Sequence, residues 1–242
     1  MSNKELTVLT LVTKSYITLL HDYFLTTLPA EIEKMKILYV NDFDNCRYNS
    51  VAKFLEKKRL EMIYKEIKAN MGNNLIFIDA DVLFASKTKF QDEINEILEN
   101  YDLAFQFNDD WYNFGVFAIS CNERTESLFK HFLEKEIHKV FDEADLHDQH
   151  LINGLLGLCP ANVGIEYEVE KTFDNVTHCS LPIKYFANHF TQYQYPHDVP
   201  SDIVLLHATN TYNMEEKLNL MSHFKHHYYD LGIQHESSKA IV

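Results

Sequence analysis

The order of apolar and amphipathic segments in the first 80 residues constrains the fold more than any other feature. Three apolar runs, Leu6–Val12, Met35–Val40 and Leu75–Ile78, each have the length and composition of a buried strand. Amphipathic stretches with helical spacing separate them, first over Tyr16–Leu28 and then in a long helix that begins near Ser50. Strands that alternate with helices pair mostly in parallel. We therefore predict an α/β fold whose mostly parallel central sheet is flanked by helices on both faces.

The rest of the chain continues with shorter elements and no sign of a second domain. The pattern predicts helices over Gln91–Glu99 and from Glu123 to about Val140, and strands over Asp102–Phe107, Phe114–Ser120 and Ile203–Leu206. No internal repeat, low-complexity segment or linker rich in Gly, Ser or Pro interrupts it. We expect one domain over residues 1–220 and a C-terminal helix and tail over residues 221–242.

Charge and composition exclude several classes of partner. The chain has 242 residues, with 22 Lys and Arg against 36 Asp and Glu, which gives a formal net charge of −14. A protein this acidic repels the phosphates of nucleic acids and of anionic lipid surfaces. With 46% hydrophobic and 13% aromatic residues, it has the composition of a packed globular domain. We expect a small or neutral ligand and no nucleic-acid partner.

The cysteines and the apolar runs indicate a compartment. Cys46, Cys121, Cys159 and Cys179 are widely spaced and form no C-x-x-C pair, as is typical of reduced thiols. The first residues show no export signal, and charge interrupts each apolar run well before the roughly 20 residues that a membrane span requires. We expect a cytoplasmic protein without a transmembrane segment. The pattern gives no oligomeric state.

Two carboxylates follow the buried strand Leu75–Ile78. Because side chains alternate along an extended chain, Asp79 and Asp81 point the same way and Ala80 points the opposite way. They lie where the strand leaves the sheet, which is the edge at which open α/β sheets bind ligands. Paired acids so near a core favour a divalent cation, which offsets their charge. The alternative interpretation is a solvated pair that caps the next helix.

The segment Ile76–Phe84 (IFIDADVLF) resembles the D-x-D segment of nucleotide-sugar glycosyltransferases with the A-type fold. Three more segments follow in the same order as in that family: Tyr112–Phe117, Asp148–Asn153 and Leu205–Asn210. The likeness covers roughly residues 5 to 220 and is strongest to the retaining nucleotide-diphospho-sugar transferases. It implies a single-domain, Rossmann-like glycosyltransferase fold.

The resemblance assigns a metal site. Asp79 and Asp81 with His207 would hold a divalent metal that bridges the donor's diphosphate and stabilises the leaving nucleotide. An imidazole ligand shifts the preference from magnesium toward manganese. His207 is one of 13 histidines, and a packing role is the ordinary reading of a histidine outside this context.

The resemblance also assigns residues to the transferred sugar. Asn113 would orient its hydroxyl groups, and Gly115 would allow close packing beside it. Asp148 and Gln149 would lie near the anomeric carbon, either supplying a nucleophile or stabilising a positively charged, oxocarbenium-like centre. We leave both mechanisms open. The structural alternatives are a strand-entry cap for Asn113 and a helix N-cap for Asp148.

Residues for the nucleotide and the diphosphate come from several segments. Arg59, or its neighbour Lys58, and the late Lys217 would face the diphosphate. Asp42, after the second strand, is a weaker candidate for the pocket that holds the nucleotide base and ribose, with turn chemistry as its alternative. The remaining residues that the resemblance places around the donor are Thr10, Val12, Thr13, Tyr16, Asp79 and Ala80.

Two segments match nothing in the family. The aromatic and His-rich stretch Tyr185–Pro200 would suit the stacking of an acceptor sugar or ordinary packing on the core. The C-terminal histidines His223, His226 and His227, and the tyrosines Tyr228 and Tyr229, are typical of a terminal helix and tail, with a metal role as the weaker alternative.

Together these features predict a metal-dependent transferase that moves a sugar from a nucleotide-diphosphate donor, UDP-sugar first, to a hydroxyl of a glycan or similar acceptor, with retention. One alternative is a phosphatase of the haloacid dehalogenase type, with Asp79 as nucleophile and Asp81 as acid. That class expects Thr or Val where this chain has Leu83. The other is a non-catalytic domain that binds sugar nucleotides.

Overall fold

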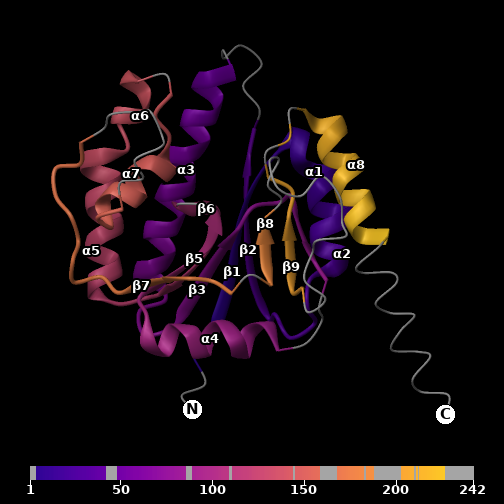
Figure 1. The fold of residues 1–242 in the computed structure, drawn as a ribbon, viewed down its shortest axis with the longest axis horizontal. Helices are drawn as coiled ribbons and strands as arrows, with labels where there is room; N and C mark the ends of the chain where they lie inside the picture. The colour runs from indigo at the N-terminus through magenta and orange to yellow at the C-terminus, as the bar shows by residue number, and fades with distance from the viewer. Residues whose placement is uncertain are drawn as a thin grey trace.

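The computed structural model describes residues 4–41, 48–85, 89–108, 111–143, 145–158, 168–182, 184–187, 203–209, 211 and 213–226. These residues form an α/β fold with helices packed on both sides of a central sheet (Figure 1). A smaller sheet lies beside the carboxyl end of the central one. The predicted fold class is confirmed.

The central sheet has six strands in the order β2-β1-β3-β6-β5-β7. Their bounds are Leu6–Thr13 (β1), Lys34–Val40 (β2), Asn74–Ile78 (β3), Leu103–Asn108 (β5), Trp111–Ser120 (β6) and His178–Ser180 (β7). β1 pairs in parallel with β2 and β3, and β7 pairs in parallel with β5. β6 is antiparallel to both of its neighbours, β3 and β5. The sheet is therefore mostly parallel, with one reversed strand in its middle.

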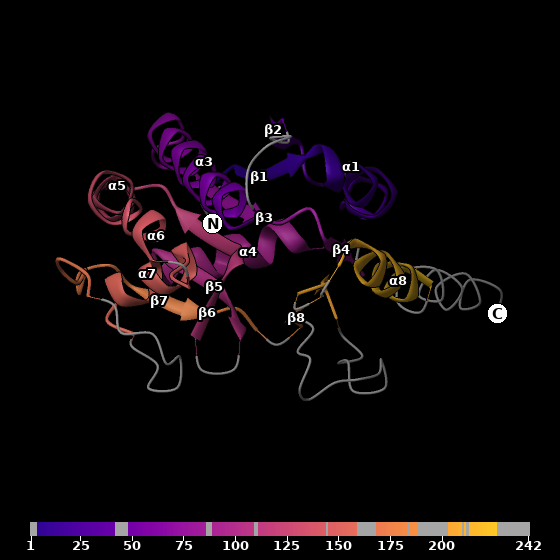
Figure 2. The same cartoon turned by 90° about the horizontal axis from the view of Figure 1, so that it is seen from above.

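Two groups of helices cover the sheet. One face packs against α3 (Tyr48–Ala69), α5 (Glu123–His131), α6 (Lys139–Asp142) and α7 (Asp148–Leu155). The other carries the short helices α1 (Ile17–Leu19) and α2 (Leu25–Thr27) and the longer α4 (Phe90–Asn100), with α8 (Met214–Phe224) beside α1 and α2. Seen from above, α3, α5, α6 and α7 gather on one side of the molecule and α1 and α8 on the other (Figure 2). No helix among the described residues is both long and apolar enough to cross a membrane.

The two apolar faces of β1 explain why both helical layers are needed. Leu9 packs into the core beneath α3 and α5, whereas Val8 and Val12 pack into the core that contains Phe24 and Phe90. Leu9 and Val8 are both completely buried. Because β1 is buried on both faces, successive residues along it are apolar, and this explains the continuous apolar run in its sequence.

The smaller sheet brings a distant part of the chain to the end of β3. Its order is β4-β9-β8, with bounds Val82–Phe84 (β4), Tyr185–Ala187 (β8) and Leu205–His207 (β9). β4 starts directly after Asp81 and pairs antiparallel with β9, so that Val82 lies opposite His207. The backbone N–H of Ala208 also donates to the carbonyl oxygen of Asp81, at 3.0 Å.

Several element bounds differ from the sequence-based expectation. β6 begins at Trp111 rather than Phe114 because its first residues pair with the end of β5, and β9 is Leu205–His207 rather than Ile203–Leu206 because it pairs with β4. The helix expected to run to Val140 is α-helical only to His131 and continues as a π-helical turn. That wider turn is compatible with an inward-facing Glu136, which pairs there with Lys139 and His131. α8 runs across position 220 without a break.

Candidate metal centre and donor site

Asp79 and Asp81 leave the end of β3 on the same side. Ala80 packs with Val82 in the core that contains Ile78. The backbone N–H of Asp79 donates to the carbonyl of Gly115 on β6, at 2.8 Å, which extends the pairing of β3 with β6 by one residue. The Asp79 side chain is 34% exposed and that of Asp81 is 7% exposed. One carboxylate is therefore open to solvent and the other is buried.

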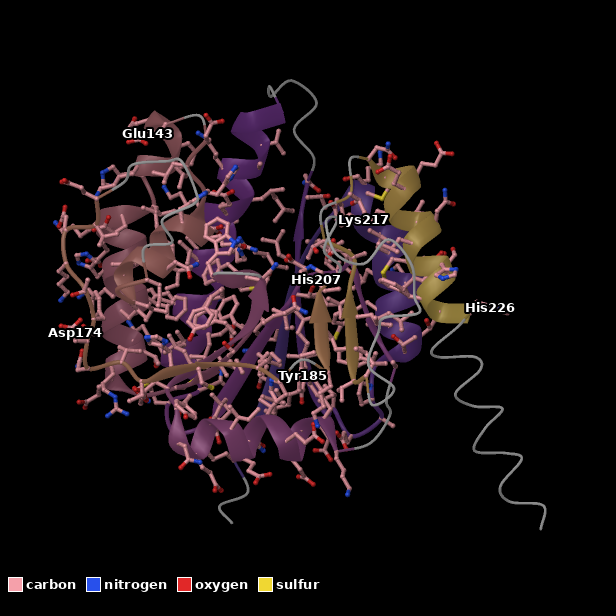
Figure 3. All side chains as sticks on the ribbon, viewed as in Figure 1. Glu143, Asp174, Tyr185, His207, Lys217 and His226 are labelled. Carbon is pink, nitrogen blue, oxygen red and sulfur yellow. The ribbon has the colours of Figure 1, made fainter. Side chains whose placement is uncertain are left out.

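His207 completes a group of three potential metal ligands. Its Nε2 lies 3.4 Å from Oδ1 of Asp81 and 3.8 Å from Oδ2 of Asp79. One ligand atom from each of the three residues lies within 4.8 Å of the others. Two carboxylates and an imidazole suit a divalent cation, with coordination positions left over for the oxygens of a ligand. The residues present therefore fit the metal that the resemblance implies. Figure 3 labels His207 and, on α8, Lys217.

Gly115 provides the space in which these side chains meet. A Cβ atom at this position would lie 2.3 Å from Oδ2 of Asp79 and 2.6 Å from Cε1 of His207. Contacts this short require the two ligands to move apart. A side chain at this position would therefore displace one or both of these ligands.

A cation pairs with each carboxylate. Lys217 donates a short hydrogen bond to Oδ2 of Asp81. Arg59 donates from Nε and Nη2 to Oδ2 of Asp148, the former at 3.1 Å, and its Nη1 lies 3.7 Å from Oδ1 of Asp79. Its guanidinium lies over the Phe114 ring, 4.9 Å from the ring centre. Arg59 is therefore held between two carboxylates and an aromatic face.

The carboxylates differ in their proton affinity. Burial raises the pKa of Asp81, but Lys217 and His207 outweigh it, so the pKa lies well below its ordinary value. Burial raises the pKa of Asp79, and Arg59 opposes the rise without cancelling it. Burial likewise raises the pKa of Asp148 to about 7 despite its bond to Arg59. Asp81 is thus a permanent anion, whereas Asp148 titrates near neutrality.

A cavity of about 310 Å³ opens beside these residues. It brings together most of the residues predicted to face the donor, from the first strand, the D-x-D segment and the late lysine. Leu11, Ala52, Leu55, Glu56 and Phe77 form the rest of its wall. The predicted residues in the wall are Thr13, Tyr16, Arg59, Asp79, Ala80, Asp81 and Lys217.

Two of the predicted donor residues lie elsewhere. Thr10 is completely buried, and Val12 packs into the core with Leu20 and Phe24. Both side chains point to the face of β1 that lies away from the cavity, while Leu11 and Thr13 point toward it. The prediction included residues from both faces of the strand, but side chains alternate between the two faces, so only every second residue reaches the cavity.

The structure also separates Arg59 from Lys58. Lys58 pairs with Glu61 on the same helix and is partly exposed, whereas Arg59 lines the cavity. Asp42, the weaker candidate, lies outside the described residues.

The three residues predicted near the sugar surround the same edge. Asn113 lies within β6 rather than at its entry, and its Oδ1 accepts from the Gly115 N–H at 2.6 Å. Gln149 Oε1 accepts from the Phe114 N–H at 3.1 Å. Asp148 is the first residue of α7 and is preceded by His147 as the N-cap, so the N-cap interpretation of Asp148 was one residue off.

Sequence reasoning missed two polar residues near the site. Glu56 lines the cavity; it accepts the Asp148 N–H at 3.3 Å, and His147 Nδ1 lies 2.8 Å from its other oxygen. Gln106 Oε1 lies 2.7 Å from Nδ1 of His207. Neither residue is marked by a motif in the sequence, because Glu56 is one of many charged residues on a helix and Gln106 lies in a mostly apolar strand.

The described residues of the two segments without a family match do not line the cavity. Tyr185 is buried, and its hydroxyl donates to Glu93 on α4 at 3.0 Å. Residues 188–200 and 227–242 are outside the described part of the chain, so the remaining tail residues have no structural account. Among the described residues, the groups that could hold a metal contain neither His223 nor His226.

Comparison with known proteins identifies the family. A sequence model of nucleotide-diphospho-sugar transferases matches residues 65–221, which include the D-x-D segment, Asn113, Asp148 and His207. The chain belongs to this family. As a nucleotide-diphospho-sugar transferase it is a glycosyltransferase, which decides against the phosphatase alternative. No curated protein sequence matches the chain.

Solved structures with the same fold are distant in sequence. A glycosyltransferase involved in the glycosylation of the major capsid of PBCV-1 has 12% identity and a TM-score of 0.55, over 90% of this chain and 98% of that one. The glycosyltransferase GlyE of Streptococcus pneumoniae TIGR4 has 14% identity and a TM-score of 0.53, over 98% of this chain and 64% of that one. At these identities the likeness shows the fold alone.

Proposed function

We propose that this transferase moves a sugar from a UDP-sugar to a hydroxyl group of a glycan, with retention and with Mn²⁺ as cofactor. The observation that carries the proposal is the meeting of Asp79, Asp81 and His207 at the wall of a cavity that also contains Arg59 and Lys217. Family membership supplies the class of reaction, and the site supplies the residues.

The metal would be held by the two carboxylates and Nε2 of His207. When bound, it stabilises the negative charge that grows on the nucleotide diphosphate as the bond to the sugar breaks. An imidazole ligand beside two carboxylates favours Mn²⁺ over Mg²⁺, which prefers oxygen ligands alone.

Arg59 and Lys217 would bind the diphosphate. Both line the cavity, and each is already close to a D-x-D carboxylate. The chain carries a net charge of −14, so an incoming diphosphate meets a repulsive field apart from these groups. This makes the dependence on metal and on the two cations strict.

Other residues of the cavity wall suit a nucleoside. Leu11, Ala52 and Leu55 are apolar, Tyr16 offers an aromatic face, and Thr13 offers a hydroxyl. Apolar surface combined with a few polar groups is the usual lining of such sites. Asn113, Asp148 and Gln149 would lie next to the transferred sugar, and the two mechanisms considered for Asp148 both place its carboxylate there.

The deciding experiment measures UDP release from UDP-sugars with and without Mn²⁺. We expect release in Mn²⁺ and its loss in Asp79→Asn, Asp81→Asn and His207→Ala. The control is Asp92→Asn, a carboxylate in the first turn of α4, which should behave as wild type. Binding of UDP without release would show a non-catalytic domain, and phosphate release from simple monoesters would contradict transfer. The anomeric configuration of the product, read by NMR, tests retention.

A further inference from the structure

A buried glutamine connects the candidate metal ligand to the rest of the fold. Gln106 lies in β5 and is completely buried. Its Oε1 lies 2.7 Å from Nδ1 of His207, and its Nε2 donates to the backbone carbonyl of Tyr185 at 3.0 Å. Figure 3 labels His207 and Tyr185, which lie on the adjacent strands β9 and β8.

The hydrogen bond to Tyr185 decides which way the amide points. A backbone carbonyl can only accept, so the amide NH₂ of Gln106 must face Tyr185 and its oxygen must face His207. An oxygen acceptor at 2.7 Å requires a proton on Nδ1 of His207. In the neutral ring, the lone pair is then on Nε2, which faces Asp79 and Asp81.

The aspartates by themselves favour the opposite arrangement. A proton on Nε2 could be donated to Asp81, whose Oδ1 is 3.4 Å away, and this tautomer has no lone pair on Nε2 for a metal held by the aspartates. Gln106 disfavours the Nε2–H tautomer because its amide oxygen would then face an unprotonated Nδ1, and the two lone pairs would repel each other. We propose that Gln106 is a positioning residue that holds His207 in the Nδ1–H tautomer and so keeps Nε2 available to a divalent cation. This inference rests on the proposed metal site.

A purely structural role for Gln106 makes a different prediction. Gln106 joins β5 of the central sheet to β8 of the smaller sheet through Tyr185, and Glu93 anchors Tyr185 from the other side. Loss of this bridge would loosen the smaller sheet whatever the state of the imidazole. The two roles use different atoms of the amide, the oxygen toward His207 and the nitrogen toward Tyr185, and can be separated.

Two substitutions separate them. Gln106→Met removes both hydrogen bonds, while Gln106→Glu keeps an oxygen acceptor for Nδ1–H but, when ionised, cannot donate to Tyr185. We expect both variants to lose thermal stability. Only Gln106→Met should lose affinity for Mn²⁺ measured by calorimetry, by about 10- to 100-fold, the usual effect of removing a partner of a ligating histidine. Asn95→Leu, which removes a half-buried amide on α4, should lose stability and keep its Mn²⁺ affinity.

The second readout needs no metal. In ¹⁵N-histidine NMR spectra of the metal-free protein, recorded at a pH at which the ¹⁵N shifts of His207 are those of a neutral ring, we expect Nδ1–H for His207 in wild type and Gln106→Glu and Nε2–H in Gln106→Met. His207→Ala assigns the signal. An Nε2–H ring in wild type, an unchanged tautomer in Gln106→Met, or equal losses of Mn²⁺ affinity in both Gln106 variants would overturn the inference. If Mn²⁺ does not bind wild type, the proposed function fails, and the spectra still decide the role of Gln106.

Discussion

The two sides of the candidate metal centre are built differently. Asp81 is buried, pairs with Lys217 and has a pKa well below its ordinary value. Asp79 is one-third exposed, lies 3.7 Å from Arg59 and has a raised pKa. Both carboxylates line the cavity. The Asp81 side is the closed side, because its carboxylate is buried and permanently charged. The Asp79 side is the open side, because its carboxylate is more exposed and shares its one guanidinium with Asp148, so its charge can respond to a ligand.

Substitution on the closed side should have the largest effect. Asp81→Asn removes a ligand and leaves Lys217 buried without its anion, so we expect at least an approximately 100-fold loss of Mn²⁺ affinity and of UDP release. Calorimetry and a release assay measure both. Equal losses in Asp79→Asn would erase the difference between the two sides, and unchanged Mn²⁺ affinity in Asp81→Asn would remove the metal assignment.

The meeting point of the two sides is tested at Gly115. Gly115→Ala places a Cβ against Asp79 and His207, so we expect an approximately 10- to 100-fold loss of Mn²⁺ affinity. Gly72→Ala is the matched control, because that residue has φ of +87° and no atom within 4 Å of the added Cβ. It should lose about 1–2 kcal/mol of stability, the cost of a Cβ in the left-handed region, and keep its Mn²⁺ affinity. Full metal binding in Gly115→Ala would show that the ligands do not converge there.

The open side depends on the shape of Arg59. Arg59→Lys keeps the charge but cannot reach Asp148 and Asp79 together, so we expect about 10-fold weaker binding of UDP, with Mn²⁺ affinity reduced less. Lys58→Gln changes the neighbouring, partly exposed cation and should leave both unchanged. Calorimetric titration with UDP in Mn²⁺ measures the difference. A larger effect at Lys58 would reverse the assignment of the two residues.

The smallest expected effect is on the pH dependence of the free energy of unfolding, to which Asp148 on the open side and Asp81 on the closed side contribute with opposite sign. Burial raises the pKa of Asp148 to about 7, so in the metal-free protein its contribution to stability is full below about pH 4 and is lost as the pH rises through 7. The lowered pKa of Asp81 acts the other way, and its contribution is lost as the pH falls below about 4. Urea unfolding from pH 4 to 8 should show a flatter profile in Asp148→Asn, and an unchanged slope would refute the raised pKa.

Much of this site could be predicted because it follows from neighbouring residues. Asp79 and Asp81 share a side by strand alternation, and the apolar run before them locates the sheet edge. Strand alternation also explains why Thr10 and Val12 do not face the donor as predicted, since only every second residue of β1 reaches the cavity. Arg59 could be distinguished from Lys58 only in the structure, because both lie on one helix and its rotation relative to the sheet depends on packing.

The sequence by itself determined the alternating α/β order, the D-x-D pair and the family, because these depend on periodicities and motifs within short segments. The family resemblance already grouped His207 with Asp79 and Asp81, but only the tertiary structure shows that β9 pairs with β4 and so sets Val82 opposite His207. The tertiary structure also decided that Gln106 reaches across from β5 to orient that histidine. Contacts of this kind depend on how whole elements pack, and an amide in an apolar strand carries no local pattern that announces its partner.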